Sequence, residues 1–316
     1  MQHKHVILLM VLICAALALA YIFMGLNADN WNFNFPRRVK IIAAIVVVGA
    51  AIGLSAVTFQ TVTGNHILTP GIIGLDSLYL FVQTVVVWSF GSGMLAMMND
   101  LPSFLLTLLL MTGFSTLLFV AILRRNSGNI YFLVLVGFVC GTVFTGLSTF
   151  MQVIIDPSEF SVLEGRMFAT FNRINTDLLN VAAIIVIAVY ALTMRDFPLL
   201  DVLTLGRNQA INLGVNHRSI VMRSLIGTAI MISAATVLVG PITFLGIMSV
   251  SLARVLFKTW RHDVLVHGCF LLTTAILLLG MLLTERLFQF AAPLSVIINF
   301  VGGGYFLYLL FKAKHI

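Results

Sequence analysis

Long apolar runs constrain the fold of this chain more than any other feature of its sequence. Of its 316 residues, 60% are hydrophobic and 9% are charged, and a soluble fold cannot present such a composition to water. A helix needs about 20 apolar residues to cross the ~30 Å hydrocarbon core of a bilayer, and most runs have that length. We therefore predict an all-α, polytopic membrane protein in which residues 1–316 form one transmembrane domain.

The runs predict about ten transmembrane helices, with nine to eleven as the range. They cover residues 6–25, 39–59, 77–90, 103–123, 130–151, 178–194, 219–239, 242–257, 264–284 and 295–311. Those at 77–90 and 242–257 are short and are bordered or interrupted by Gly, Pro or Ser, which predicts broken helices. The first 20 residues resemble a signal peptide, but the apolar run continues beyond them, so we expect a retained first span.

The positive charges predict the orientation of these spans. If the N-terminus is cytoplasmic, 12 of the 18 Lys and Arg residues lie on the cytoplasmic side, and most acidic residues lie outside. This bias favours a cytoplasmic location for both termini. The net charge of +7 is then mainly a topology signal, so we expect the chain to partner a lipid bilayer and no nucleic acid.

One polar segment, residues 203–215, follows a predicted span and is too short and too polar to cross a bilayer. Apolar and small residues alternate in it with polar ones, which predicts a short amphipathic helix that ends at Gly214. In a protein made almost wholly of spans, we expect such a helix to dock on another protein at the cytoplasmic surface. An interfacial helix that lies in the lipid headgroups is the alternative.

The sequence lacks the signatures of an enzyme or a metal site. No phosphate-binding G-x-x-x-x-G-K-[ST] loop occurs, so this chain does not bind ATP phosphates by itself. Cys14, Cys140 and Cys269 lie singly in apolar runs, and the five-residue spacing of His262 and His267 does not suit a metal pair. We predict no catalytic residue, no metal and no cofactor.

Ionisable residues inside the predicted spans are scarce. Asp76 and Glu285 come closest, and both fall at predicted span ends. Ion-coupled secondary transporters usually bury such groups as proton or ion relays. The pattern argues against proton coupling and favours an energy source outside the membrane part.

Small and polar residues form a stripe along the run at 130–151. The spacing places them on one helix face, which predicts a lining for a translocation path, or alternatively a packing face for close helix contact. Gly49 and Gly53 followed by Gln60 give the second span a comparable face. The residues that we assign to the path are Gln60, Gly137, Gly141, Thr145 and Ser148.

Four sequence blocks resemble the permeases of bacterial iron-siderophore and vitamin B12 ABC importers, the FecCD-like family. They occur in the order typical of that family, from about residue 36 to the C-terminus. The blocks are Gly53-x6-Gln60-x4-Asn65-x4-Pro70-x3-Gly74, Gly206-x3-Ala210-x2-Leu213-Gly214-Val215, Gly240 to Gly246 followed by Arg254, and Pro293 to Leu310.

This resemblance implies a subunit that pairs with a second permease, as a homodimer or a heterodimer, in the bacterial inner membrane. It implies a ferric siderophore as substrate, a periplasmic siderophore-binding protein that delivers it, and cytoplasmic ATP-binding subunits that drive its import. Residues 68–79 resemble the branch that serves catecholate siderophores. The alternatives are a cobalamin or haem permease of the same family, or an ion-coupled secondary transporter. The residues expected to couple to the ATPase are Leu205, Gly206, Ala210, Leu213, Gly214 and Val215.

The sequence departs from the family pattern at three places. The usual Arg-x-Pro-Arg before the second span reads Asn34-Phe-Pro-Arg37, the usual Asn-Pro has His66 in place of proline, and the usual Pro-His reads Val250-Ser251. The missing arginine resembles one that pairs with an acid of the binding protein. Other arginines on the same predicted side would then replace it, unless they simply extend from span ends toward water. They are Arg37, Arg38, Arg166 and Arg173.

Overall fold

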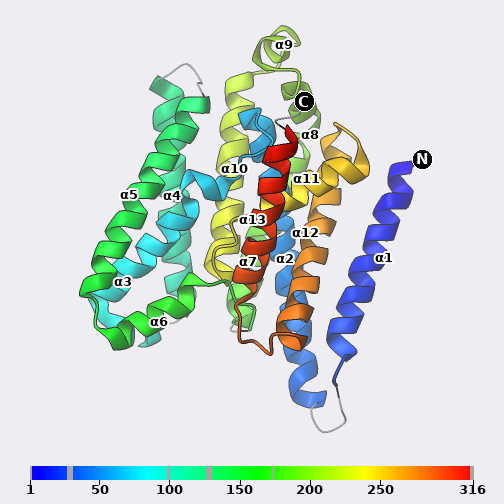
Figure 1. The fold of residues 1–316 in the computed structure, drawn as a ribbon. Helices are drawn as coiled ribbons and strands as arrows, with labels where there is room; N and C mark the ends of the chain where they lie inside the picture. The colour runs from blue at the N-terminus through cyan, green and yellow to red at the C-terminus, as the bar shows by residue number, and fades with distance from the viewer. Residues whose placement is uncertain (1, 27–30, 98–99, 126–129, 173, 314–316) are drawn as a thin grey trace.

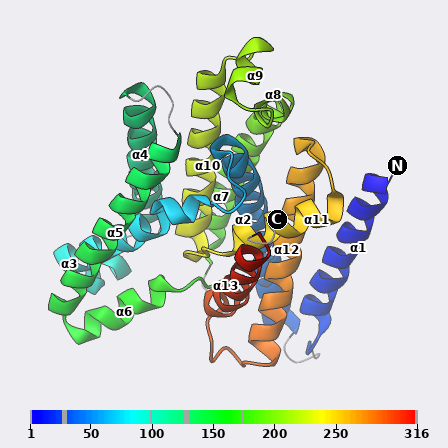
Figure 2. The ribbon, with the colours of Figure 1, turned by 45° about the horizontal axis from the view of Figure 1, so that its top comes forward.

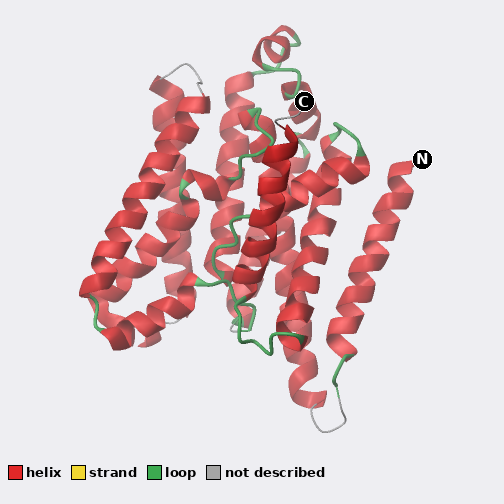
Figure 3. Ribbon diagram, in the orientation of Figure 1, coloured by secondary structure: helices red, strands yellow, loops and turns green. Residues whose placement is uncertain are grey.

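The computed structural model describes residues 2–26, 31–97, 100–125, 130–172 and 174–313, and in these ranges every regular element is helical (Figure 3). The elements are α1 (Gln2–Phe23), α2 (Trp31–Thr63), the 3-10 helix η2 (Pro70–Ile73), α3 (Leu75–Met97), α4 (Asp100–Arg125), α5 (Ile130–Ile154), α6 (Pro157–Met167), α7 (Thr176–Met194), α8 (Phe197–Leu203), α9 (Arg207–Asn212), α10 (His217–Val239), α11 (Leu245–Phe257), α12 (His262–Arg286) and α13 (Leu294–Ala313).

Seven of these helices are long and apolar enough to cross a membrane, namely α1, α2, α4, α5, α7, α10 and α12. Shorter apolar stretches occur in α3, α11 and α13. Together these ten elements overlap the ten predicted ranges, so the prediction of an all-α polytopic fold is confirmed. The longest helix, α2, has 33 residues and begins well before the predicted span.

The seven long helices run side by side, with α3, α11 and α13 among them, and the other α-helices, α6, α8 and α9, lie toward the two ends of the bundle (Figure 1). Helices α8 and α9 and the connection from α11 to α12 lie at one end. Helix α6 and the connection from α12 to α13 lie at the other end. The start of α1 and the end of α13 both lie toward the α9 side (Figure 1), which agrees with the ten predicted spans.

Two of the short segments follow breaks in the backbone. The chain leaves α2, turns through η2 and enters α3 at Gly74, whose φ is 88°; it leaves α10 at Gly240, whose φ is 101°. Both values lie in the region that favours glycine. A side chain at Gly74 would collide with the backbone of Gly141 in α5, since a Cβ atom there would lie 2.6 Å from its Cα. These breaks therefore lie inside the bundle, packed against other helices.

Helices α2, α10 and α12 form the buried centre, where α2 packs on both α10 and α12. Gly49 and Gly53 of α2 face α12, and a Cβ atom at Gly53 would lie 2.9 Å from the Cα of Phe270. Small residues let two helix backbones approach closely, which is the main source of helix association in a bilayer. The small face of the second span is thus a packing surface for α12.

Arg38 connects α1, α2 and α12 at the end of the bundle where α6 lies. Its Nη1 atom lies 2.9, 2.8 and 2.7 Å from the carbonyl oxygens of Tyr21, Ile22 and Met24, and its Nη2 atom lies 2.6 Å from Glu285. The guanidinium thereby satisfies carbonyls at the end of α1, which have no partner within the helix, and ties α1 to α2 and α12. This differs from the prediction that Arg38 docks a binding protein, because the side chain is turned inward and only 10% exposed.

We predict that Arg38→Gln lowers the free energy of unfolding by about 3 kcal/mol, because it removes the 2.6 Å ion pair of Glu285, leaves this partly buried carboxylate only the more distant Arg286 at 3.7 Å, and frees the carbonyl oxygens at the end of α1. Arg37→Gln is the matched control, since Arg37 is the neighbouring arginine and is exposed. Thermal unfolding of the detergent-solubilised subunit measures both. Equal unfolding temperatures for the two variants would contradict the role of Arg38.

Candidate functional site

Helices α8 and α9 connect α7 to α10 at one end of the bundle (Figure 2). We call residues 197–215, which comprise these two helices and the turns that follow them, the hook. Gly206 precedes α9 with φ 93°, and Gly214 follows it with φ 82°. A Cβ atom at either position would meet nothing within 4 Å, so backbone conformation rather than space favours glycine there. The helix predicted within residues 203–215 is confirmed as α9. Sequence reasoning missed α8, which opens on Phe197-Pro198 in the pattern of a helix start.

The hook has a distinct inner and outer face. Leu205, Ile211 and Leu213 expose 59%, 49% and 62% of their surface, whereas Ala210 is fully buried and Val215 packs on the main core. We predicted Ala210 as a contact to the ATPase, but it faces the chain's own interior. Its small side chain lets α9 lie close to the structure beneath it. The apolar residues that remain free to meet a partner are Leu205, Leu213 and Ile211. The two leucines were predicted from the sequence, whereas Ile211 was not.

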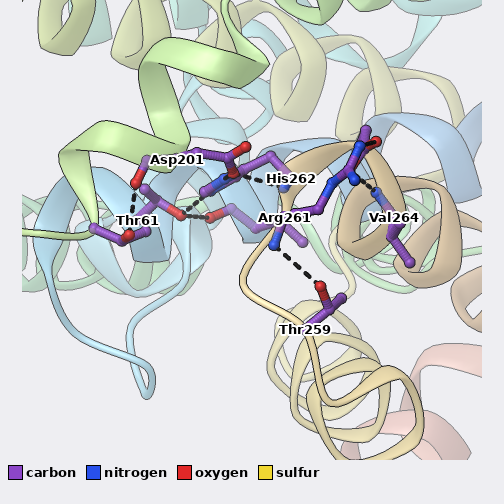
Figure 4. A network of polar contacts seen from close by, with 9 residues as sticks. Thr61, Asp201, Thr259, Arg261, His262 and Val264 are labelled. Atoms are coloured by element: carbon purple, nitrogen blue, oxygen red, sulfur yellow. Dashed lines mark hydrogen bonds and ion pairs between the residues drawn. The ribbon is translucent and has the colours of Figure 1, made fainter. Parts of the chain in front are cut away.

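A polar network joins the hook to the spans (Figure 4). Asp201 of α8 accepts hydrogen bonds from the backbone nitrogen and the Nδ1 atom of His262, at 2.8 and 2.6 Å. The Nε2 atom of His262 lies 2.7 Å from the hydroxyl of Thr61 in α2. A neighbouring ion pair between Arg261 and Asp263, at 2.6 Å, is largely exposed. Sequence reasoning considered His262 only as a metal ligand and missed this network.

Gln60 and Arg254 meet inside the same end of the bundle. The Arg254 Nη2 atom lies 3.5 Å from Gln60 Oε1, and Gln60 has no exposed surface. In the part of the chain that the structure describes, Gln60 Nε2 and Arg254 Nε have no hydrogen-bond partner. Burial, and next the charge of Arg254, lowers the pKa of His66 in the loop after α2. Gln60 was predicted to line the path. In the structure its side chain points from α2 toward Arg254 of α11, inside the subunit.

Asp76 lies deeper than the sequence indicates. It is the second residue of α3, as expected for a span end, but α3 begins at a break inside the bundle. Its carboxylate accepts a hydrogen bond of 2.7 Å from Thr243, in the turn between α10 and α11. The hydrogen bond between the partly buried Asp76 carboxylate and Thr243 therefore connects the two breaks.

The stripe on α5 packs against the chain's own α3. Gly137 and Gly141 are buried, and a Cβ atom at Gly141 would lie 2.8 Å from the Cα of Gly74. Thr145 donates a hydrogen bond of 3.1 Å to Ser77, and Ser148 is buried. The packing alternative therefore describes this face, and the path role stays a prediction. The face of α5 that remains exposed carries Phe138, Val139, Thr142, Val143, Gly146, Leu147 and Phe150.

The predicted docking arginines differ in their surroundings. Arg37 is exposed at the start of α2, whereas Arg166 of α6 is half-buried and donates a hydrogen bond of 3.0 Å to Gln83. Arg166 also lines a cavity of about 280 Å³ between α3, α4, α6 and α10. Arg38 is held inside by Glu285, and Arg173 lies outside the described residues.

Comparisons with known proteins extend along nearly the whole chain. The sequence model of the FecCD transport family matches residues 5–312. The petrobactin import system permease YclO of Bacillus subtilis is 45% identical over 302 residues, 96% of each chain. The petrobactin import system permease FatC of Bacillus anthracis is 32% identical over 278 residues, 88% of this chain and 78% of FatC. A solved structure described as an inward-facing, metal-chelate type ABC transporter is 21% identical, with a TM-score of 0.86 over 98% of this chain and 99% of that chain.

We predict that Gly141→Ala lowers the free energy of unfolding by about 1–3 kcal/mol, because the new methyl group pushes α5 away from the backbone at Gly74. Gly146→Ala is the control, since a Cβ atom there meets nothing within 4 Å. Thermal unfolding of the purified subunit compares the variants. A Gly141→Ala protein as stable as Gly146→Ala would show that the two backbones do not pack as described.

Proposed function

We propose, from the premise that this chain belongs to the FecCD transport family, that it is the membrane-spanning permease subunit of a bacterial ABC importer for a ferric siderophore. Its resemblance to the petrobactin permease YclO along 96% of both chains carries this proposal. Petrobactin is a catecholate siderophore, which supports the catecholate branch over cobalamin or haem as cargo. The chain acts as a transport subunit and not as an enzyme.

We propose that the hook formed by α8 and α9 docks on a cytoplasmic ATP-binding subunit. The α9 part of the hook lies at the outer end of the bundle (Figure 2), and the hook's exposed apolar residues, Leu205, Ile211 and Leu213, are set among polar residues. An apolar patch of this kind suits a groove on a protein partner. The α9 end is then cytoplasmic. Since α1 begins and α13 ends on that side, both termini are cytoplasmic. As part of a bacterial importer, the protein resides in the inner membrane. The energy comes from ATP hydrolysis on the partner.

A second permease subunit, identical or different, would complete the route for the siderophore. The exposed face of α5, with Thr142 and Gly146 among its apolar residues, supports a contact between subunits near that route. Gly303 and Gly304 of α13 likewise have open space around them, which permits close approach of another helix. The stripe residues would line the route only where α5 and α3 separate, and Thr145 is exposed at that edge.

The opposite end would receive the siderophore-binding protein. Arg38 is held in its ion pair with Glu285. The predicted docking arginines that remain for this contact are Arg37, Arg166 and Arg173. A ferric tris-catecholate is bulky and anionic, so its route needs width and few acidic groups. Asp76 is occupied by Thr243, an arrangement that supports a structural role rather than ion coupling.

We predict that Ile211→Glu combined with Leu213→Glu reduces siderophore uptake about tenfold or more, because it places charge in an apolar contact. Gln209→Glu adds charge to the same helix without removing apolar surface and serves as the control. Proteoliposomes with the complete complex and loaded binding protein report uptake and ATP hydrolysis. Normal uptake by the double variant would exclude docking through this face.

Cells that lack this chain should lose growth on a catecholate siderophore under iron limitation. They should keep growth on haem and normal uptake of cobalamin, because other permeases serve those cargoes. Growth with petrobactin, enterobactin or vibriobactin as the iron source, with and without a plasmid copy of the gene, measures this. A defect confined to haem or cobalamin would replace the siderophore proposal by one of its alternatives.

A further inference from the structure

One imidazole joins three separate elements at the α9 end of the bundle. His262, the first residue of α12, has 1% exposed surface and lies between Asp201 of α8 and Thr61 of α2 (Figure 4). Its two ring nitrogens lie 2.6 and 2.7 Å from these partners. Such short contacts on both sides of a buried ring fix its orientation, so the three elements are held in one arrangement.

The hydrogen bonds assign a direction to each contact. With Nδ1–H donating to Asp201, the Nε2 atom of a neutral imidazole is an acceptor, so the Thr61 hydroxyl can donate to it at 2.7 Å as well as to the carbonyl oxygen of Val57 at 3.0 Å. Asp201 Oδ1 accepts both from the imidazole and from the backbone nitrogen of His262. The carboxylate therefore also satisfies one of the free N–H groups at the start of α12.

The arrangement resembles the nucleophile, base and acid of a hydrolase, but its chemistry differs. A catalytic hydroxyl must reach a substrate with its oxygen, whereas the Thr61 hydroxyl is half-buried in α2 and lies between the His262 ring and the Val57 carbonyl. The ring is also buried away from any substrate. A mechanical connection remains as the role of this network.

The connection lies between the hook and the two most central helices. Helix α8 packs on α2 and α12, and the same two helices are packed closely along their length. At their far end Arg38 joins α2 to Glu285 of α12. A displacement of α8 therefore reaches α2 and α12 together, through Thr61 on one side and the start of α12 on the other.

We propose that His262 is a positioning residue that transmits movement of the docked hook to the paired helices α2 and α12. The inference rests on the proposed function, since it needs an ATP-binding subunit on the hook. It adds a route by which ATP hydrolysis on that partner moves the membrane part. His262 contacts neither siderophore nor nucleotide and acts through Thr61 and Asp201.

Thr61 offers a test that separates transmission from packing. Thr61→Val keeps the shape of the side chain but removes the hydroxyl, whereas Thr61→Ser keeps the hydroxyl and removes a methyl group. If the network transmits movement, siderophore transported per ATP hydrolysed falls at least about fivefold in Thr61→Val and is retained in Thr61→Ser. If Thr61 only fills space, the serine variant is the more impaired.

The measurement uses the complete complex in proteoliposomes, with loaded binding protein, and is normalised to the amount of assembled complex. Asp201→Asn should lower the same ratio as Thr61→Val, and combining the two should add little, because both act through His262. Arg261→Ala is the control, since its ion pair with Asp263 is exposed and it acts on Asp201 of α8 through charge alone, without entering the His262 hydrogen bonds.

The outcomes separate the two proposals. A wild-type complex that neither imports a ferric siderophore nor hydrolyses ATP in response to it overturns the proposed function, and the inference with it. A coupled wild-type complex with unchanged transport per ATP in Thr61→Val and Asp201→Asn overturns the inference alone. A loss of transport that merely follows a loss of assembled complex also overturns it.

Discussion

The close contact between α2 and α12 is the interaction on which the rest of the structure depends. Gly49 and Gly53 bring the two backbones together, and in a bilayer such packing replaces the hydrophobic driving force that soluble proteins use. Polar contacts then fix both ends of the pair, through Arg38 and Glu285 at one end and Thr61 and His262 at the other. The flanking helices pack on a unit whose register is set by glycines and whose ends are set by charge and hydrogen bonds.

The broken segments follow from a second constraint. A backbone that leaves a helix inside the membrane must find new hydrogen-bond partners in the protein, because lipid offers none. Here the break before α3 and the break before α11 lie against other helices, and Asp76 and Thr243 join them. This explains why an acidic residue can lie deep in the bundle without indicating ion coupling: its partner is a hydroxyl at the other break.

The sequence predicted where the helices lie better than it predicted which side of each helix packs inside the chain and which side is exposed. Hydropathy located the spans, the short segments at 77–90 and 242–257 marked the breaks, and Gly214 marked the end of α9, because each is a local property of the chain. Which side of a helix meets another helix depends on tertiary packing, which composition does not encode. Ala210 was therefore assigned to the ATPase although it faces the chain's own interior, and Gly137 and Gly141 were assigned to the path although they pack against α3 and the turn before it. Arg38 was assigned to a surface although it closes a buried contact. His262 could have been found only by pairing it with Asp201, 61 residues away.

The positions of the charged residues favour an energy source outside the membrane-spanning part. A subunit that moved cargo by its own ion gradient would need titratable groups along a route, and each would cost free energy in a bilayer. This chain instead has a short helical hook outside the spans, which the buried His262 imidazole connects to α2 and α12. In the coupling that we propose, movement generated on the ATP-binding partner enters through α8. Because α2 and α12 are joined at both ends, it would reach them as one body. The apolar faces of α5 and α13 can then shift relative to a second subunit without any charge having to cross the membrane.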